Sequence, residues 1–407
     1  MMFSFWLPRK EVPLFNPLPA ILIGGPPHAG KSVLTYSLTQ ALRKRHIDHY
    51  VIRACPDGEG DWSQEIDREA VRLIRIKGQW KPEFVRSVCH ALERRHFPLL
   101  VDMGGRPEAW QRDIISSCTH SLLLLRSDDE ASSDFWQRLV QENGLLPLAR
   151  LNSLLQGPST ITAQAPVIEG TLTGLDRQSL TQGPLFDALV ERIDTLFTSY
   201  SSEELRQGYF NMAPAEVVDL DALLQQHAPQ LERWEPQMLP ALLAELPRAR
   251  PLAVYGRGTN WLYGALVDHT GSQDFYQFDP RLGWVVPPQL RSGILPSTQS
   301  INIEVRQYTD ITLLSIRLVH DYLDYSEADA LVFPSISPER GVILNGKLPL
   351  WLVTALVHLY NTSVGVPWVA CYSPQLKRAV VVASRVETHA PGRLIASPLF
   401  SGDIEGV

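Results

Sequence analysis

The sequence predicts an α/β protein in which one domain with a parallel sheet precedes two small tandem α/β domains. Three observations support this fold class. An apolar strand, a glycine-rich loop and a helix follow one another near the start, strands and helices alternate as far as Phe197, and the second half contains an internal repeat. The expected divisions are an N-terminal extension, the first domain and two repeats, at residues 1–19, 20–205, 206–298 and 299–407.

The most specific motif is the loop GPPHAGKS, which lies between an apolar strand at 20–24 and a helical pattern from Val33. Its spacing is that of a phosphate-binding P-loop, in which the loop and the start of the helix surround the phosphates. Lys31 is expected to reach the β- and γ-phosphates and the Ser32 hydroxyl to ligate Mg²⁺. The alternative is a glycine-rich turn that matches by chance. The predicted nucleotide-binding residues are Gly25, Pro26, Pro27, His28, Ala29, Gly30, Lys31 and Ser32.

A carboxylate follows the apolar strand predicted at 98–102, where a P-loop protein needs a second Mg²⁺ contact. Asp102 is expected to hold the ion through a water. Gly104 or Gly105 can bring a backbone N–H close to the γ-phosphate, because neither carries a side chain. The alternative role for Asp102 is to cap a helix that starts near Pro107.

Acidic residues also follow the strand predicted at 50–55, and they include Asp57, Glu59 and Asp61. Ligands of open α/β sheets bind beyond the carboxyl ends of strands, so these residues are candidates for positioning water, a second metal or a substrate hydroxyl. A solvated turn of Asp and Gly is the alternative. Further strands are predicted at 120–125, 146–151 and 167–171, and helices at 81–95, 107–118, 129–142 and 185–196.

Composition restricts the function classes. The 407 residues suffice for two or three domains, and the net charge of −7 argues against non-specific nucleic-acid binding. Four scattered cysteines suit a reducing compartment. No apolar run approaches the length that spans a bilayer, and Pro and charged residues interrupt the first 19 residues, so we expect no membrane association, no signal peptide and a cytoplasmic location.

The second half repeats a short pattern. Gly256 and Trp261 recur 90 residues later as Gly346 and Trp351, and Phe278-Asp-Pro-Arg-Leu282 recurs 94 residues later as Tyr372-Ser-Pro-Gln-Leu376. Each copy is predicted to form a strand, a glycine turn, a helix, a strand, a Pro-containing turn and a strand. The alternative is two similar α/β units without common origin. Both tryptophans suit core packing better than base stacking.

These residues resemble the small ring nucleases of type III CRISPR systems, and the P-loop segment resembles the AAA-type module found fused to that family. The resemblance implies a compact domain that pairs with itself, so that two copies form an intramolecular pseudo-dimer. It also implies a homo-oligomer that binds cyclic tetra-adenylate between dimers and cleaves it with the help of Mn²⁺.

The resemblance carries catalytic roles to Asp279, Arg281 and, after a gap, His269. The second copy has Ser373 and Gln375 at the first two positions and Asn361 at the third, so at most one of the two sites is expected to be competent. Asp279 can instead be the first residue of its turn, and His269 a surface histidine.

We therefore expect an ATP-binding, Mg²⁺-dependent P-loop protein of a CRISPR-linked defence system whose tandem half binds a cyclic oligoadenylate, with cleavage left open. One alternative is a non-catalytic sensor that controls the ATPase. The other is a P-loop kinase with Asp57 as its base. The sequence does not distinguish ATP from GTP, because it has no guanine-reading motif.

Overall fold

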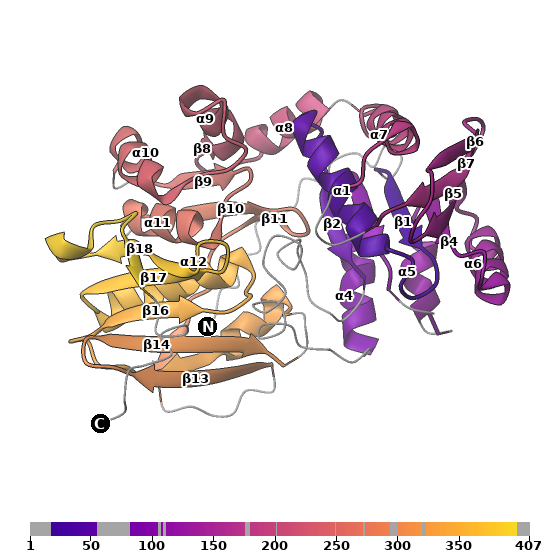
Figure 1. Ribbon diagram of the computed structural model, residues 1–407. Coiled ribbons are helices and arrows are strands. Elements are labelled where there is room, and N and C mark those ends of the chain that lie inside the picture. The colour runs from indigo at the N-terminus through magenta and orange to yellow at the C-terminus, as the bar shows by residue number, and fades with distance from the viewer. Residues whose placement is uncertain are drawn as a thin grey trace.

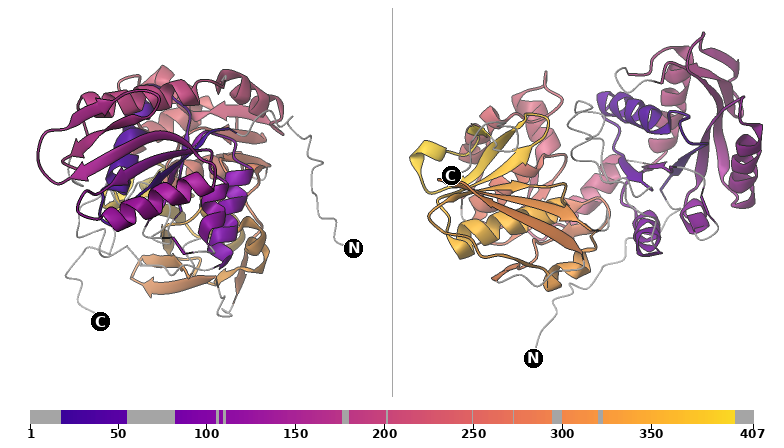
Figure 2. Two further views of the ribbon diagram at one scale, coloured as in Figure 1. Left: turned by 90° about the vertical axis from the view of Figure 1, so that its right-hand side faces the viewer. Right: turned by 60° about the horizontal axis from the view of Figure 1, so that its bottom comes forward.

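The protein is described by a computed structural model and consists of two lobes, the first indigo to magenta and the second rose to yellow in Figure 1. A view from below also separates the lobes (Figure 2). The structure describes residues 18–54, 82–104, 107–108, 111–175, 180–200, 202–248, 250–271, 273–293, 300–319 and 323–396.

The first lobe contains a seven-stranded sheet in the order β2-β3-β1-β4-β5-β7-β6. All neighbours are parallel except β6 and β7, which form an antiparallel edge. The six predicted strands are present, and β6 was missed. The strands are β1 (Ala20–Gly24), β2 (Tyr50–Arg53), β3 (Leu99–Asp102), β4 (His120–Leu125), β5 (Leu146–Leu154), β6 (Thr160–Ala163) and β7 (Ile168–Thr173).

Helices lie on both faces of this sheet, as the alternating pattern predicts. The helices α1 (Lys31–Lys44) and α7 (Pro184–Phe197) pack over one face. The other face carries α4 (Pro82–Glu93), α5 (Arg112–Ser116) and α6 (Glu130–Glu142). Leu34, Leu38 and Leu42 of α1 recur every four residues and are fully buried, which fixes the face that α1 presents to the sheet. Within the helix predicted at 107–118, the structure describes α5, which begins at Arg112 and ends at Ser116.

A helix joins the lobes at the predicted boundary. α8 (Ser202–Asn211) runs across residue 205, so the boundary is helical rather than an extended linker. It is followed by β8 (Glu216–Asp219), α9 (Leu220–His227), η2 (Pro236–Met238) and α10 (Leu239–Glu245).

The second lobe contains two sheets. The first, in the order β11-β10-β9-β8, is formed with β9 (Leu252–Tyr255), β10 (Phe275–Asp279) and β11 (Gly283–Val285), and α11 (Asn260–Thr270) joins β9 to β10. The second has the order β13-β14-β16-β17-β18-β19. Its strands are β13 (Ile301–Gln307), β14 (Ile311–Leu318), β16 (Gly341–Asn345), β17 (Trp368–Ser373), β18 (Arg378–Ser384) and β19 (Leu394–Ala396).

Shorter elements complete this lobe. The strands β12 (Arg291–Gly293) and β15 (Val332–Pro334) pair with each other. Helical segments are η3 (Tyr325–Ala330), α12 (Leu350–His358), η4 (Leu359–Val364) and η5 (Glu387–His389). Because β12 precedes residue 298 and β15 follows it, the chain pairs across the predicted division between the repeats.

The two repeated segments have the same element order and the same strand directions. In the first, β8, β9 and β10 are parallel and β11 is antiparallel to β10. In the second, β14, β16 and β17 are parallel and β18 is antiparallel to β17. Trp261 of α11 and Trp351 of α12 are 2% and 0% exposed and belong to one continuous core, so both tryptophans pack the interior.

Polar contacts also join the two segments. The Thr354 Oγ1 of α12 donates to the Gln277 Oε1 of β10 at 2.9 Å in the buried core. At the other end of the interface, the Asn260 Nδ2 of α11 donates to the Tyr372 carbonyl of β17 at 3.1 Å. Each helix therefore contacts a strand of the other segment, and the two segments share one interior.

Candidate functional site

The glycine-rich loop lies between β1 and α1, near the centre of the first sheet (Figure 1). Gly25 has φ +145°, and a Cβ there would lie 2.0 Å from the Leu124 carbonyl oxygen. Gly30 has φ +86°, and a Cβ there would lie 2.6 Å from the Leu175 side chain. Both positions therefore require glycine on conformational and steric grounds. The loop therefore lies between Leu124 of β4 and Leu175, which follows β7 by two residues.

The lysine of the motif is buried within the loop. Lys31 is 6% exposed, and its Nζ donates to the carbonyls of Gly25 at 2.9 Å and Pro26 at 2.7 Å. Lys31 is the first residue of α1, a helix of 14 residues, and Gly30 is its N-cap. A buried ammonium and a helix N-terminus thus lie together at one loop, the combination that favours an anion.

Asp102 ends the strand next to β1. The register pairs it with Ile23 of β1 on one side and with Arg53 of β2 on the other. The carboxyl group is 1% exposed, and within the described part of the chain neither oxygen has a hydrogen-bond partner. The alternative of a helix cap is not realised, because the N-cap of α5 is Gln111. A buried carboxylate without partners is costly unless something charged meets it.

The residues fit a magnesium ion. Mg²⁺ prefers oxygen ligands and binds through one or two protein groups together with substrate phosphates. Asp102 has two oxygens available, and Ser32 is a half-buried hydroxyl residue in the first turn of α1. Among the described residues, no three His, Cys, Asp or Glu side chains converge on a point that suits a metal. In the part of the chain that the structure describes, Ser32 and Asp102 are therefore the candidate ligands.

Several predicted residues cannot be placed. Asp57, Glu59, Asp61 and Gly105 lie outside the described residues. Arg53, the residue of β2 that pairs with Asp102, is 7% exposed. Gly104 is described and follows Met103, whose N–H donates to the Ile23 carbonyl at 3.2 Å. It thus lies close to the end of β1.

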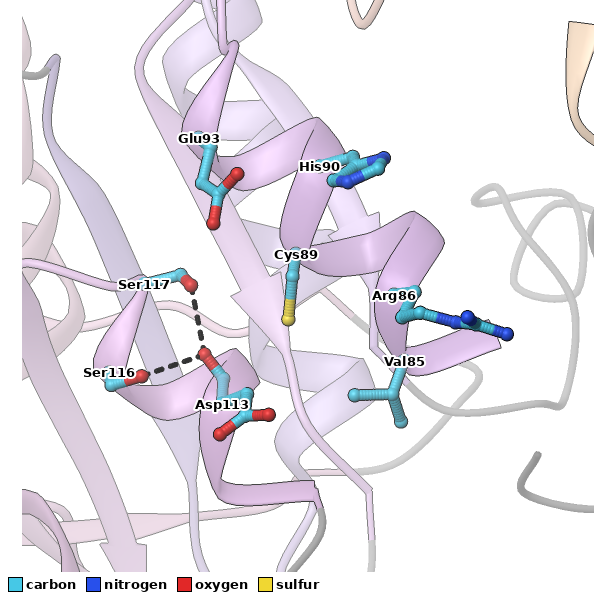
Figure 3. Close-up of a pocket in the computed structure, with 8 residues that line it drawn as sticks. All are labelled: Val85, Arg86, Cys89, His90, Glu93, Asp113, Ser116 and Ser117. Carbon is cyan, nitrogen blue, oxygen red and sulfur yellow. Dashed lines mark hydrogen bonds between the residues drawn. The ribbon is translucent and has the colours of Figure 1, made fainter. Parts of the chain in front are cut away.

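Two clefts on the first lobe lie apart from the loop. One, of about 350 Å³, lies between α4 and α5 (Figure 3), and the other, of about 410 Å³, lies along β4, β5 and β7 beside the start of α6. In the first cleft, burial raises the pKa of the Cys89 thiol, which disfavours a reactive thiolate. The residues lining the first cleft are Val85, Arg86, Cys89, His90, Glu93, Asp113, Ser116 and Ser117.

In the first repeated segment, the two charged residues of the predicted catalytic turn, Asp279 and Arg281, pair with each other. The Asp279 Oδ1 accepts from the Arg281 backbone N–H at 2.8 Å and from its Nε at 3.3 Å, and Oδ2 accepts from Nη2 at 3.4 Å. Asp279 and Arg281 are 7% and 8% exposed. The structure brings these two residues together, and it does so in the manner of a turn-closing pair.

The first lobe covers this turn. His96 and Phe97 precede β3, and the His96 Nδ1 lies 3.3 Å from the Pro280 carbonyl oxygen. The Tyr209 hydroxyl donates to the His96 carbonyl at 2.7 Å. Around them lies an aromatic cluster, defined as Phe97, Tyr209, Phe210, Tyr255, Phe278 and Trp284. Rings of Phe97 and Phe278 meet edge-on at 5.9 Å between centroids, which is a favourable geometry.

Charged residues flank the aromatic cluster. Asp48 and His49 precede β2. The charge of Arg257 in the second lobe affects the pKa of both, and the charge of Asp221 affects the pKa of Asp48. Burial, opposed by Arg257, raises the pKa of Asp48. Burial and the charge of Arg257 lower the pKa of His49 to about 3. The N-terminal ends of β2 and β3 therefore face the second lobe, whereas the glycine-rich loop lies at the opposite ends of the strands.

His269 is not part of the Asp279 turn. It lies near the end of α11, and β10 then carries the chain back, so Asp279 is at the far end of the strand, about 13 Å from its start. The His269 Nε2 lies 3.1 Å from the Leu246 carbonyl oxygen. Within this chain, the predicted grouping of Asp279, Arg281 and His269 is therefore wrong for His269, because antiparallel packing of helix and strand separates them.

The matching turn of the second segment is built differently. The Ser373 Oγ donates to the Gln375 Oε1 at 3.2 Å, and residues 375–378 are all exposed. Lys377 has φ +50°, in the left-handed region where Gly283 of the first turn has φ +76°. Asn361, at the predicted histidine position, donates through Nδ2 to the Asp268 Oδ1 at 2.5 Å. Burial raises the pKa of Asp268 to about 6.

Two further findings concern membrane-spanning helices and similarity to a known protein family. Within the described ranges, no helix has the length and apolar character needed to cross a lipid bilayer. Residues 316–396, from β14 to β19, match the family model of the CRISPR-associated protein Cas_csx3. This match confirms the CRISPR-associated part of the resemblance for the second repeated segment. Residues 316–396 are therefore similar to a CRISPR-associated protein family.

Proposed function

We propose that the first lobe binds a magnesium complex of a nucleoside triphosphate, with ATP as the expected nucleotide. The observation that carries the proposal is the buried Lys31 at the start of α1, in a loop whose two glycines admit no side chain. Backbone N–H groups and the helix N-terminus provide the positive surface that phosphates require. The unpartnered Asp102 carboxylate, one strand away, supports a cation at the same site.

Each residue has a distinct task in this proposal. Lys31 exchanges its two loop carbonyls for the β- and γ-phosphate oxygens, and the loop keeps the triphosphate in register with α1. Ser32 and Asp102 would hold Mg²⁺, which neutralises phosphate charge when bound. The proposal includes both hydrolysis and transfer of the γ-phosphate, and Asp57, the candidate base for transfer, lies outside the described residues.

Calorimetry of the full chain with ATP and GTP, with and without Mg²⁺, tests this proposal. The parent is expected to bind at least one of them in a Mg²⁺-dependent manner, and Lys31→Ala is expected to abolish binding. Lys44→Ala, a lysine at the far end of the same helix, is the matched control and should bind as the parent does. Absence of binding by the parent contradicts the proposal. Transfer of labelled γ-phosphate to a small molecule instead of water would identify a kinase.

We propose further that the second lobe binds a cyclic oligoadenylate messenger in a CRISPR-linked system, as a cytoplasmic homo-oligomer. The match at 316–396 supports the CRISPR association, and the two equivalent segments with one core support a pseudo-dimer. The first turn is a poor fit for Mn²⁺, because Asp279 is buried and paired with the cationic Arg281 side chain. No metal-dependent cleavage step follows from these residues.

This arrangement favours a sensor over a nuclease. The first turn is buried and neutralised, and the second has Ser373 in place of the carboxylate. Incubation with cyclic tetra-adenylate and Mn²⁺, followed by chromatography, is expected to return the intact ring. If the parent cleaves the ring and Asp279→Ala does not, the result supports the nuclease function instead of the sensor.

A further inference from the structure

The cleft of about 410 Å³ lies on a part of the first sheet that the triphosphate proposal does not use. Among the described residues, the core formed with α4, α5 and α6 includes side chains of β1 to β4 but none of β5, β6 or β7. The face that these last three strands turn towards the α6 side is therefore not packed against those helices. The cleft lies between this face and the start of α6.

Strand register places the cleft at the level of the glycine-rich loop. Gly24, the last residue of β1, lies opposite Leu123 of β4, which in turn lies opposite Arg150 of β5. Asn152 lies two residues further along β5 and lines the cleft. It is therefore level with the loop and two strand spacings, about 10 Å, to its side. A nucleoside extends over a distance of this kind from the phosphate that it carries.

The loop and the cleft also share two neighbouring elements. A Cβ at Gly24 would lie 2.7 Å from the Trp136 ring of α6, and Ser133, one turn before Trp136, lines the cleft. Leu125, the last residue of β4, also lines the cleft, and the carbonyl oxygen of the residue before it lies against Gly25. A ligand held at the loop can therefore reach the cleft along β4 and α6.

The charged side chains of the cleft neutralise one another. The Arg150 Nη2 lies 3.0 Å from the Glu169 Oε1, and the Arg126 Nη2 lies 2.5 Å from the Asp128 Oδ2. Each arginine that lines the cleft is thus already paired with a carboxylate. A phosphate would have to compete with these acids for the guanidinium groups, so the cleft suits an uncharged group.

An amide side chain without a partner lies in this neutral cleft. Asn152 is half-buried, and within the described ranges its amide forms no hydrogen bond. Its register neighbours, Leu125 on one side and Thr171 on the other, also line the cleft. An asparagine amide both donates and accepts, which matches the amino group and ring nitrogen of adenine. An apolar side chain and a hydroxyl flank the amide, as a planar heterocycle requires.

We infer that this cleft binds the adenine base of the nucleotide whose phosphates occupy the glycine-rich loop, and that Asn152 is the residue that selects adenine. The inference rests on the proposed nucleotide-binding function. It assigns the charged part of the ligand to the loop and the uncharged ring to the neutral cleft.

Calorimetry of the full chain with the Mg²⁺ complexes of ATP, GTP and inorganic tripolyphosphate tests the inference. The parent should bind ATP more tightly than it binds GTP or tripolyphosphate. Asn152→Leu removes donor and acceptor at similar size and should weaken ATP binding about tenfold. Its tripolyphosphate affinity should equal that of the parent, which also shows that the variant is folded. Asn302→Leu, the same change at an exposed position of β13, is the matched control and should bind ATP as the parent does.

The outcomes separate the inference from the proposed function. If the parent binds none of the three ligands, the proposed nucleotide site fails and the base cleft with it. If the parent binds ATP and Asn152→Leu binds it equally well, the base cleft is wrong while nucleotide binding stands. Equal affinity of the parent for ATP and GTP, or for ATP and tripolyphosphate, also overturns the inference. Loss of tripolyphosphate binding in Asn152→Leu would show that Asn152 acts on the loop and not on the base.

Discussion

Substitution of Asp102 by asparagine should raise stability and abolish the response to Mg-ATP. The carboxyl group is 1% exposed, and within the described residues neither oxygen has a hydrogen-bond partner. Leaving a buried polar group unsatisfied costs about 1–3 kcal/mol, and a charged group costs more. Asparagine keeps the shape and removes the charge, so we expect a gain of about 1 kcal/mol, equivalent to about 2–4 °C in melting temperature.

The stabilisation by Mg-ATP, in contrast to the stability of the free protein, should decrease in Asp102→Asn. Mg-ATP at about one hundred times its dissociation constant stabilises a folded protein by about 2.7 kcal/mol, and the parent should show this shift in a thermal melt. Asp102→Asn should lose most of it, because the amide is a poor Mg²⁺ ligand. Ser32→Ala should lose the shift without the gain in stability, since Ser32 is only half-buried. Asp128→Asn, at an exposed Arg126 pair, should change neither quantity.

The reasoning is refuted if Asp102→Asn melts below the parent and is stabilised by Mg-ATP to the same extent. That result would mean that the carboxylate has a structural partner and that the metal is held elsewhere. A gain in stability with an unchanged Mg-ATP shift would remove the metal role alone.

Three further predictions concern the core and the pH dependence of stability. Thr354→Val leaves the Gln277 Oε1 without its buried donor and should cost about 1–3 kcal/mol in urea unfolding; an unchanged midpoint would show that Gln277 finds another partner. His49 has its pKa lowered from 6.5 to about 3, so its stabilising effect is full above pH 6.5 and falls as the pH drops towards 3; His49→Gln should flatten the melting temperature in that window, and an unaltered profile would contradict it. Asp268 has its pKa raised from 3.8 to about 6, so its contribution is full below pH 3.8 and is lost as the pH rises through 6; Asp268→Asn should remove that loss, and an equal decline of the variant's stability between pH 3.8 and 6 would contradict it.

Local sequence patterns were sufficient for the strand and helix around the glycine-rich loop and for most other strands of the first lobe. The strand, loop and helix around Lys31 are consecutive in the chain, and the buried strands are continuous apolar runs, which the sequence displays directly. The strand β6 escaped prediction because Thr160–Ala163 is short, has no buried residue and alternates Thr with apolar residues, so it has no apolar run. Its pairing depends on the neighbouring β7.

The closure of the first turn could not be predicted, because it depends on contacts between distant parts of the chain. His96 meets Pro280 across 184 residues and Tyr209 across 113, and no periodicity links these positions. A partial signal was present in the density of aromatic residues around the repeat, which includes Tyr255, Phe278 and Trp284. The difference between Gly283 and Lys377, by contrast, is readable by aligning the repeats.

The aromatic cluster also explains why the two turns can serve different tasks in one chain. Tyr209, Tyr255 and Phe278 are 6%, 3% and 7% exposed, and full burial of such a side chain contributes about 1.5–3 kcal/mol. Exposing even about half of this surface would cost roughly 2–4 kcal/mol, which lowers the apparent affinity of a ligand for the first turn by about one and a half to three powers of ten. A ligand therefore reaches the Asp279 carboxylate, which belongs to the closed turn, only if the aromatic cluster opens.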